Sequence, residues 1–160
     1  MAKKTTSSDS KSAGSRAKRL YNRALREALK ETPDIPRVRE LLDSAIALGS
    51  PDAAYALATW YIHGAHVRKN FKRAFVLLQL AADVNIPDAL FDLANSYEMG
   101  KGVERDTSKA FELYLRAALR GEKQSVNEVG RCYYYGIGVN RDRPLSRIWY
   151  ERAEELGVRE

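Results

Sequence analysis

The sequence has 160 residues, of which 44% are hydrophobic and 30% are charged, as is usual for one soluble domain. No apolar stretch is long enough to cross a bilayer or follows the start Met as a secretory leader would, and the single Cys132 excludes an internal disulfide. We therefore expect a cytoplasmic protein without a membrane span.

The net charge of +6 is concentrated at the start of the chain, where residues 1–30 balance to +7 and the remaining residues to −1. Residues 1–15 contain no large apolar side chain and are rich in Ser, Thr and Lys, so they are predicted to form a disordered basic tail. Residues 16–50 are predicted to form a degenerate helix pair, with helices at about 16–30 and 37–48.

Three units follow, at 51–86, 87–122 and 123–158, because the sequence repeats itself at an offset of 36. The repeat aligns residues of one kind in each unit: Leu57, Leu93 and Val129; Tyr61, Tyr97 and Tyr133; Gly64, Gly100 and Gly136; Val67, Val103 and Val139; Ala74, Ala110 and Ser146; Ala81, Ala117 and Ala153. Asp34 and Pro36 precede Asp142 and Pro144 by three such periods, which links residues 16–50 to the same series. The fold class is therefore predicted to be all-α.

Each unit has the apolar periodicity of two helices. In the second unit one face comprises Leu90, Leu93, Ala94 and Tyr97, and another comprises Ala110, Leu113, Tyr114 and Ala117. The first helix of each unit ends at a glycine-containing loop, in which glycine reaches positive φ at low cost. The second helix begins at Asn70, Asp106 or Asp142, whose side chains can cap its first turn.

This pattern resembles the Sel1-like repeat family, a relative of the tetratricopeptide repeats. The resemblance is carried by Leu93-Ala94, Tyr97, Gly100, Gly102-Val103, Asp106, Lys109-Ala110, Tyr114 and Ala117-Ala118, and in the third unit by Gly130, Tyr133, Gly136, Gly138-Val139, Asp142, Tyr150 and Ala153. It implies a right-handed α-solenoid of antiparallel helix pairs, with the first helix of each pair on the concave side.

The resemblance also implies a non-catalytic adaptor that binds a partner protein or peptide on its concave face. By analogy with tetratricopeptide repeats, the candidate binding residues are Tyr55, Thr59, Ile62, His63, Phe91, Asn95, Glu98, Met99, Asn127, Arg131, Tyr134 and Tyr135. Packing between neighbouring helices is the other reading of Tyr55 and Phe91. The last helix has no following repeat to cover it, so self-association through it is a further expectation.

Two other functions stay open. The first is binding of nucleic acid or another polyanion through Arg16, Lys18, Arg19, Arg23, Arg26 and Lys30. The second is a hydrolase resembling cysteine-rich relatives associated with β-lactams, but those relatives have a Cys pair in each repeat and this chain has Cys132 alone. His63 and His66 lack a third metal ligand, so neither a metal nor a cofactor is expected.

Overall fold

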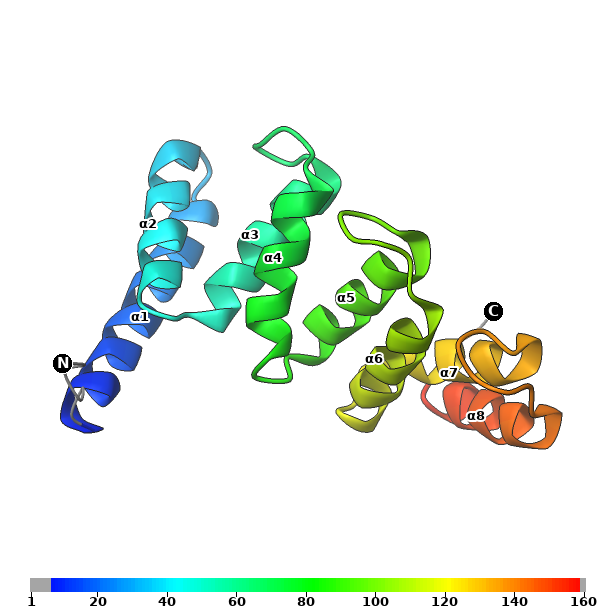
Figure 1. The fold of residues 1–160 in the computed structure, drawn as a ribbon. Helices are drawn as coiled ribbons and strands as arrows, with labels where there is room; N and C mark the ends of the chain where they lie inside the picture. Colours follow the sequence, from blue (N-terminus) through cyan, green and yellow to red (C-terminus); the bar gives the residue numbers. More distant parts are fainter. Residues whose placement is uncertain (1–6, 159–160) are drawn as a thin grey trace, which may run out of the picture. The chain divides into compact units, whose positions relative to one another are not determined.

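The computed structural model describes residues 7–158, within which the chain forms eight α-helices and no strand (Figure 1). None of these described helices is long and apolar enough to cross a membrane. The helices are α1 (Ser7–Ala28), α2 (Ile35–Ala47), α3 (Pro51–His63), α4 (Phe71–Ala82), α5 (Pro87–Met99), α6 (Thr107–Leu119), α7 (Lys123–Tyr135) and α8 (Arg143–Glu155).

The first helix differs from its prediction. α1 begins at Ser7, whereas the sequence placed its start at about Arg16 and a disordered tail before it. Only residues 1–6 of that predicted tail lie outside the described residues. The segment before Arg16 has little to bury: Ala13 is half-buried, and Lys11, Ser12, Gly14 and Ser15 are exposed. Its helical form therefore depends on continuing a helix that is stabilised further along, at Ala17 and Ala24.

The second helix of each pair begins where the capping residues predict. The side-chain oxygens of Asp34, Asn70, Asp106 and Asp142 each accept a hydrogen bond, 2.9–3.0 Å long, from the backbone N–H three residues later. Such a bond satisfies one of the N–H groups that a helix start leaves without a partner. The helix starts are thus encoded locally.

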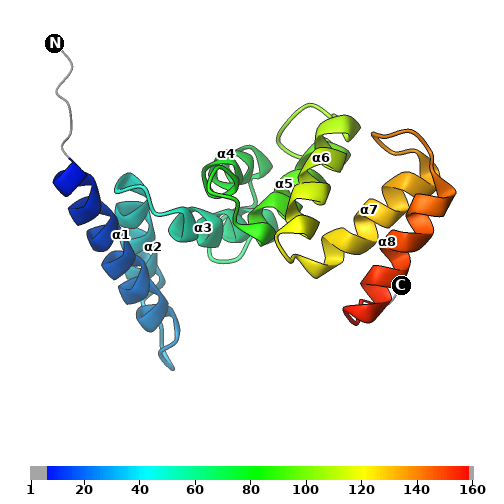
Figure 2. The ribbon, with the colours of Figure 1, turned by 90° about the horizontal axis from the view of Figure 1, so that it is seen from below.

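The chain divides into two compact units, Met1–Lys69 and Asn70–Glu160. In the first unit α1 and α2 lie side by side and antiparallel, and α3 packs on α2 (Figures 1 and 2). Small side chains line the inner face of α1, where Ala17 and Ala24 are buried, and α2 contributes Leu41 and Leu42 to the same core.

In the second unit the antiparallel pairs α5–α6 and α7–α8 pack in sequence after α4 (Figures 1 and 2). Each new first helix contacts the second helix before it through the same edge-to-face ring pair, Phe75 with Tyr97 and Phe111 with Tyr133, at 5.4 and 5.2 Å between centroids. In the first unit the equivalent residues, one period earlier, are Arg39 and Tyr61, joined by a 2.9 Å hydrogen bond. Residues that are 36 positions apart therefore make equivalent contacts between neighbouring helices.

The interhelical loops of the second unit pack tightly against the preceding helix pair. A Cβ added to Gly102 would lie 2.2 Å from the carbonyl oxygen of Phe71, and one added to Gly138 would lie 1.9 Å from that of Thr107. Both glycines also have positive φ. Glycine is required at these two positions for space as well as for backbone conformation.

Candidate protein-interaction surface

The predicted binding residues lie on the first helices α3, α5 and α7. On α3, Tyr55, Thr59 and Ile62 are half-buried and His63 is exposed. The Thr59 hydroxyl donates to the backbone oxygen of Ala56 at 2.7 Å, so it is engaged within its own helix. The predicted residues of α5 and α7 lie in the second unit.

A polar network joins α5, α6 and α7, and we define it as Asn95, Glu98, Tyr114, Glu128 and Arg131. The Tyr114 hydroxyl donates to the Glu98 carboxylate at 2.9 Å and lies 2.9 Å from the side-chain oxygen of Asn95. Arg131 Nη2 donates to both oxygens of Glu98 at 2.8 Å, and its Nε donates to Glu128 at 2.6 Å. The structure therefore brings together three of the predicted residues, Asn95, Glu98 and Arg131.

Burial and the charges within the network shift the pKa values of Tyr114 and Arg131. Burial, together with the negative charge of Glu98, raises the pKa of Tyr114, which therefore keeps its proton and remains a hydrogen-bond donor. Burial alone would lower the pKa of Arg131, but its hydrogen bonds to Glu98 and Glu128 outweigh that effect and raise it. Glu98 is only 7% exposed, so its charge requires both partners.

Because of these contacts, Glu98 and Phe91 are engaged within the fold instead of lying open to a partner. Glu98 was expected on an open face, but it is buried because Tyr114 and Arg131 enclose its carboxylate. Phe91 is half-buried with its ring 5.7 Å from that of Tyr114, as the packing alternative requires. Asn95 is half-buried within the network. Of the four predicted α5 residues, Met99 is the one left exposed, at 58%.

An exposed cluster lies at the C-terminal end of α7, in the loop after it and at the start of α8, and we call it the aromatic–arginine patch: Tyr134, Tyr135, Arg141 and Arg143. The two tyrosine rings meet edge to face at 4.8 Å. The guanidinium groups of Arg141 and Arg143 lie 6.0 and 5.3 Å from the centre of the Tyr134 ring. Tyr135 is 66% exposed, so its ring is available to a partner.

The patch and the polar network share one face of α7. Arg131 precedes Tyr134 and Tyr135 by three and four residues, the spacing that places side chains on the same side of a helix. Asn127, four residues before Arg131, is half-buried on that face. The bond between Arg131 and Glu98 connects this face to α5.

Sequence reasoning missed Arg141 and Arg143. Arg141 lies in the loop before α8 and Arg143 is the first residue of α8, whereas the candidates were taken from first helices only. Their signal was the rise in positive charge between Gly138 and Arg147, next to three consecutive tyrosines. Sequence reasoning also treated Tyr114 as core and did not consider Glu128.

The thiol of Cys132 and the imidazole of His66 were the other groups considered for chemistry, and both are engaged in packing. Cys132 is 1% exposed, and burial raises the pKa of its thiol to about 12, so it is a neutral thiol at physiological pH. His66 packs its ring on Trp60 with 4.8 Å between centroids. Within residues 7–158, no three His, Cys, Asp or Glu side chains are grouped as metal ligands would be.

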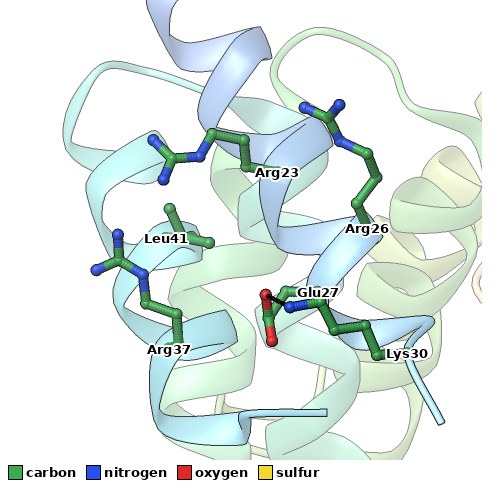
Figure 3. Close-up of a pocket in the computed structure, with 6 residues that line it drawn as sticks. All are labelled: Arg23, Arg26, Glu27, Lys30, Arg37 and Leu41. Atoms are coloured by element: carbon green, nitrogen blue, oxygen red, sulfur yellow. Dashed lines mark hydrogen bonds and ion pairs between the residues drawn. The ribbon is translucent and has the colours of Figure 1, made fainter. Parts of the chain in front are cut away.

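The basic residues of the polyanion alternative lie on or just after α1. All six, Arg16, Lys18, Arg19, Arg23, Arg26 and Lys30, are exposed. Lys30 forms a 2.7 Å ion pair with Glu27. Arg23, Arg26 and Lys30 also line a hollow next to α2 (Figure 3).

Similar solved structures come from several bacteria. A protective antigen present in uropathogenic Escherichia coli strains is 28% identical with a TM-score of 0.84, over 96% of this chain but 34% of that protein, so this chain spans about a third of its length. A Sel1 repeat protein from Oxalobacter formigenes is 35% identical with a TM-score of 0.65, over 72% of this chain and 87% of that one. An immunity protein from Pseudomonas aeruginosa is 25% identical with a TM-score of 0.59, over 89% of this chain and 53% of that one.

The sequence itself carries the family signature. A comparison with curated protein sequences gives no match. The profile of the Sel1 repeat, however, matches residues 51–85, 87–122 and 124–158, which together cover more than half of the chain. The helix pairs, their 36-residue period and the solved relatives agree with an α-solenoid repeat fold. The chain therefore belongs to the Sel1 repeat family.

Proposed function

We propose that this protein is a non-catalytic adaptor that binds a partner protein or peptide through the face of α7 that contains Arg131, Tyr134 and Tyr135. Sel1 repeat proteins generally mediate protein–protein interaction. The observation that carries the proposal is the aromatic–arginine patch, in which Tyr135 is 66% exposed beside two arginines. Tyrosine and arginine are the side chains that most often dominate the energy of protein interfaces.

The surroundings of the patch favour binding because they hold it in place. Arg131 is fixed on α7 by its bonds to Glu98 and Glu128, and the Tyr134 ring is held by Tyr135 and by Arg143. A surface that is ordered before binding loses less side-chain entropy when the partner arrives.

The charges of the patch define the chemistry of the partner. Arg141 and Arg143 are exposed and have no ion pair within the described chain, so their N–H groups can donate to carboxylates. The exposed Tyr135 ring and Met99 side chain offer apolar contact. We therefore propose a partner segment in which an acidic side chain lies next to an apolar or aromatic anchor.

The proposal is tested by affinity capture from native lysate with quantitative mass spectrometry, comparing the wild-type chain with Tyr135→Ala and Arg143→Gln. Leu119→Ala is the matched control, because Leu119 is also strongly exposed, at 71%, but lies on α6 outside the patch. A partner lost with both patch variants and retained with the control supports the proposal. A partner captured equally by all variants contradicts it.

Self-association through α8 stays a prediction, and Ile148 on that helix is 59% exposed. A cytoplasmic location also stays a prediction. Cys132, on which the hydrolase alternative would depend, is buried and its thiol is neutral.

A further inference from the structure

A hollow of about 230 Å³ opens between the C-terminal half of α1 and the start of α2 (Figure 3). Its lining is almost entirely charged: Arg23, Arg26, Glu27, Lys30, Arg37 and Leu41. Four of these six side chains are cations and one is a carboxylate, so the hollow has an excess of three positive charges. All of these residues belong to the first unit, whereas the aromatic–arginine patch belongs to the second.

The two helices contribute guanidinium groups to the same place. Figure 3 shows Arg23 reaching from α1 and Arg37 from α2, with the side chain of Leu41 between them. Leu41 is 5% exposed and forms an apolar floor. The Arg26 guanidinium points away from this pair, and Lys30 turns toward Glu27 (Figure 3).

The ion pairs of the hollow do not neutralise it. Glu27 is bound to Lys30 at 2.7 Å, and this hydrogen bond lowers the pKa of Glu27, so the carboxylate is charged at neutral pH. Arg37 donates to Glu40 through Nη1 at 2.5 Å, which leaves its other N–H groups available. The side chains of Arg23 and Arg26 have no hydrogen bond or ion pair with any other described residue. At least two guanidinium groups are therefore free to bind an anion.

We propose that this hollow is a binding site for a phosphate group carried by a small molecule. Guanidinium groups present paired N–H donors that match two phosphate oxygens at once, and Arg23 and Arg37 can do so from opposite sides. A volume of 230 Å³ leaves room for the carbon skeleton that carries the phosphate, and Leu41 supplies an apolar contact for it.

A nucleic-acid backbone would use the basic face of α1 differently. It would neutralise its phosphates on a row of cations along the helix, including Arg16 and Arg19, which lie outside the hollow. A single phosphate needs only the cations at the end of α1 together with Arg37 of α2. The contribution of Arg37 therefore favours the small ligand, since the other helix has no part in a row along α1.

The test is titration of pyrophosphate into the full chain by isothermal calorimetry at constant ionic strength. We expect one site, with Arg23→Gln and Arg37→Gln each weakening the affinity at least about tenfold, because each removes a hydrogen-bonded charge. The charge-matched control Arg19→Gln should change it less than about twofold, since Arg19 does not line the hollow. Glu27→Gln should strengthen binding, because it removes the negative charge of the lining.

Circular dichroism of each variant separates loss of binding from loss of fold. Absence of pyrophosphate binding to the wild-type chain would overturn the proposal. Equal weakening by Arg19→Gln and Arg23→Gln would also overturn it, because it would mean a diffuse basic surface. A single-stranded oligonucleotide that binds more tightly than pyrophosphate, without dependence on Arg37, would assign the basic face of α1 to nucleic acid instead.

Discussion

Replacing Gly102 by Ala should destabilise the protein far more than the same change at glycines that have positive φ but open space where a Cβ would lie. Gly102 has a φ of +80°, and an added Cβ would lie 2.2 Å from the carbonyl oxygen and 2.5 Å from the carbonyl carbon of Phe71. These are backbone atoms, which cannot rotate away as a flexible side chain could. The α5–α6 loop would therefore have to move away from the start of α4.

Two glycines separate the effect of φ from the effect of space. Gly49 has a φ of +82° and Gly121 a φ of +93°, and neither has another group within 4 Å of an added Cβ. Alanine with positive φ costs about 1–2 kcal/mol, partly offset by a gain of about 0.4–1 kcal/mol from the stiffer unfolded chain. We expect Gly49→Ala and Gly121→Ala to cost about 1 kcal/mol each. Gly102→Ala adds the cost of overpacking, about 1–3 kcal/mol, for a total of about 3 kcal/mol.

The assay is thermal and urea unfolding followed by circular dichroism at constant protein concentration. For a chain of this length, Gly121→Ala should lower Tm by about 2–4 °C and Gly102→Ala by about 6–12 °C. Gly138→Ala should resemble Gly102→Ala, because its Cβ would meet the carbonyl oxygen of Thr107. Equal losses at Gly102 and Gly121 would refute the reasoning, since they would show that backbone conformation alone requires glycine.

Other predictions concern buried or capping side chains. Ser125→Ala and Ser146→Ala should each stabilise the fold by about 1 kcal/mol, measured by urea unfolding, because neither buried hydroxyl has a partner within the described chain and the other repeats have Ala there. The control Ser96→Ala removes a hydroxyl that donates to a backbone carbonyl at 2.9 Å, so it should not stabilise the fold. A loss of stability in all three variants would contradict this prediction. Burial raises the pKa of the Cys132 thiol to about 12, so at pH 8 the thiol should react with a disulfide reagent many times more slowly in the folded than in the urea-unfolded chain. Because the folded pKa is the higher one, the stability that this thiol contributes is present at neutral pH and is lost as the pH rises above the pKa of the unfolded chain. Rapid labelling of the native chain would contradict the burial of Cys132. Asn70→Ala should cost about 1 kcal/mol by loss of the cap to Arg73, whereas Asn70→Asp should keep most of that stability, and equal unfolding midpoints for the two variants would argue against the cap.

Much of the fold was predictable because its determinants are local and repeated. The capping residues, the glycine-ended first helices and the 36-residue period predicted the helix pairs of 51–158 closely. The sequence pattern accounted for glycine at position 102 only through its positive φ. The close approach of the Phe71 carbonyl, which belongs to the preceding helix pair, cannot be read from the sequence. The start of α1 was missed because Ser- and Lys-rich residues carry no apolar period.

The binding surface was less predictable, because burial depends on what neighbouring repeats supply. Glu98 and Tyr134 occupy equivalent positions, one period apart. Glu98 is buried because the next first helix brings Arg131 against it, whereas Tyr134 is met by Arg141 and Arg143 of its own unit and remains partly exposed. A periodic sequence pattern treats the two positions alike, so it could not distinguish a buried carboxylate from a surface ring.

The most direct test of the adaptor function is photo-crosslinking in native lysate with a benzophenone amino acid placed at position 135 or, as the control, at position 119. Tyr135 and Leu119 have similar exposure, 66% and 71%, but only Tyr135 belongs to the aromatic–arginine patch. The account predicts a discrete protein adduct from position 135 that Arg143→Gln weakens, and none from position 119. Adducts from position 119 alone, or none from position 135, would contradict binding through this face of α7.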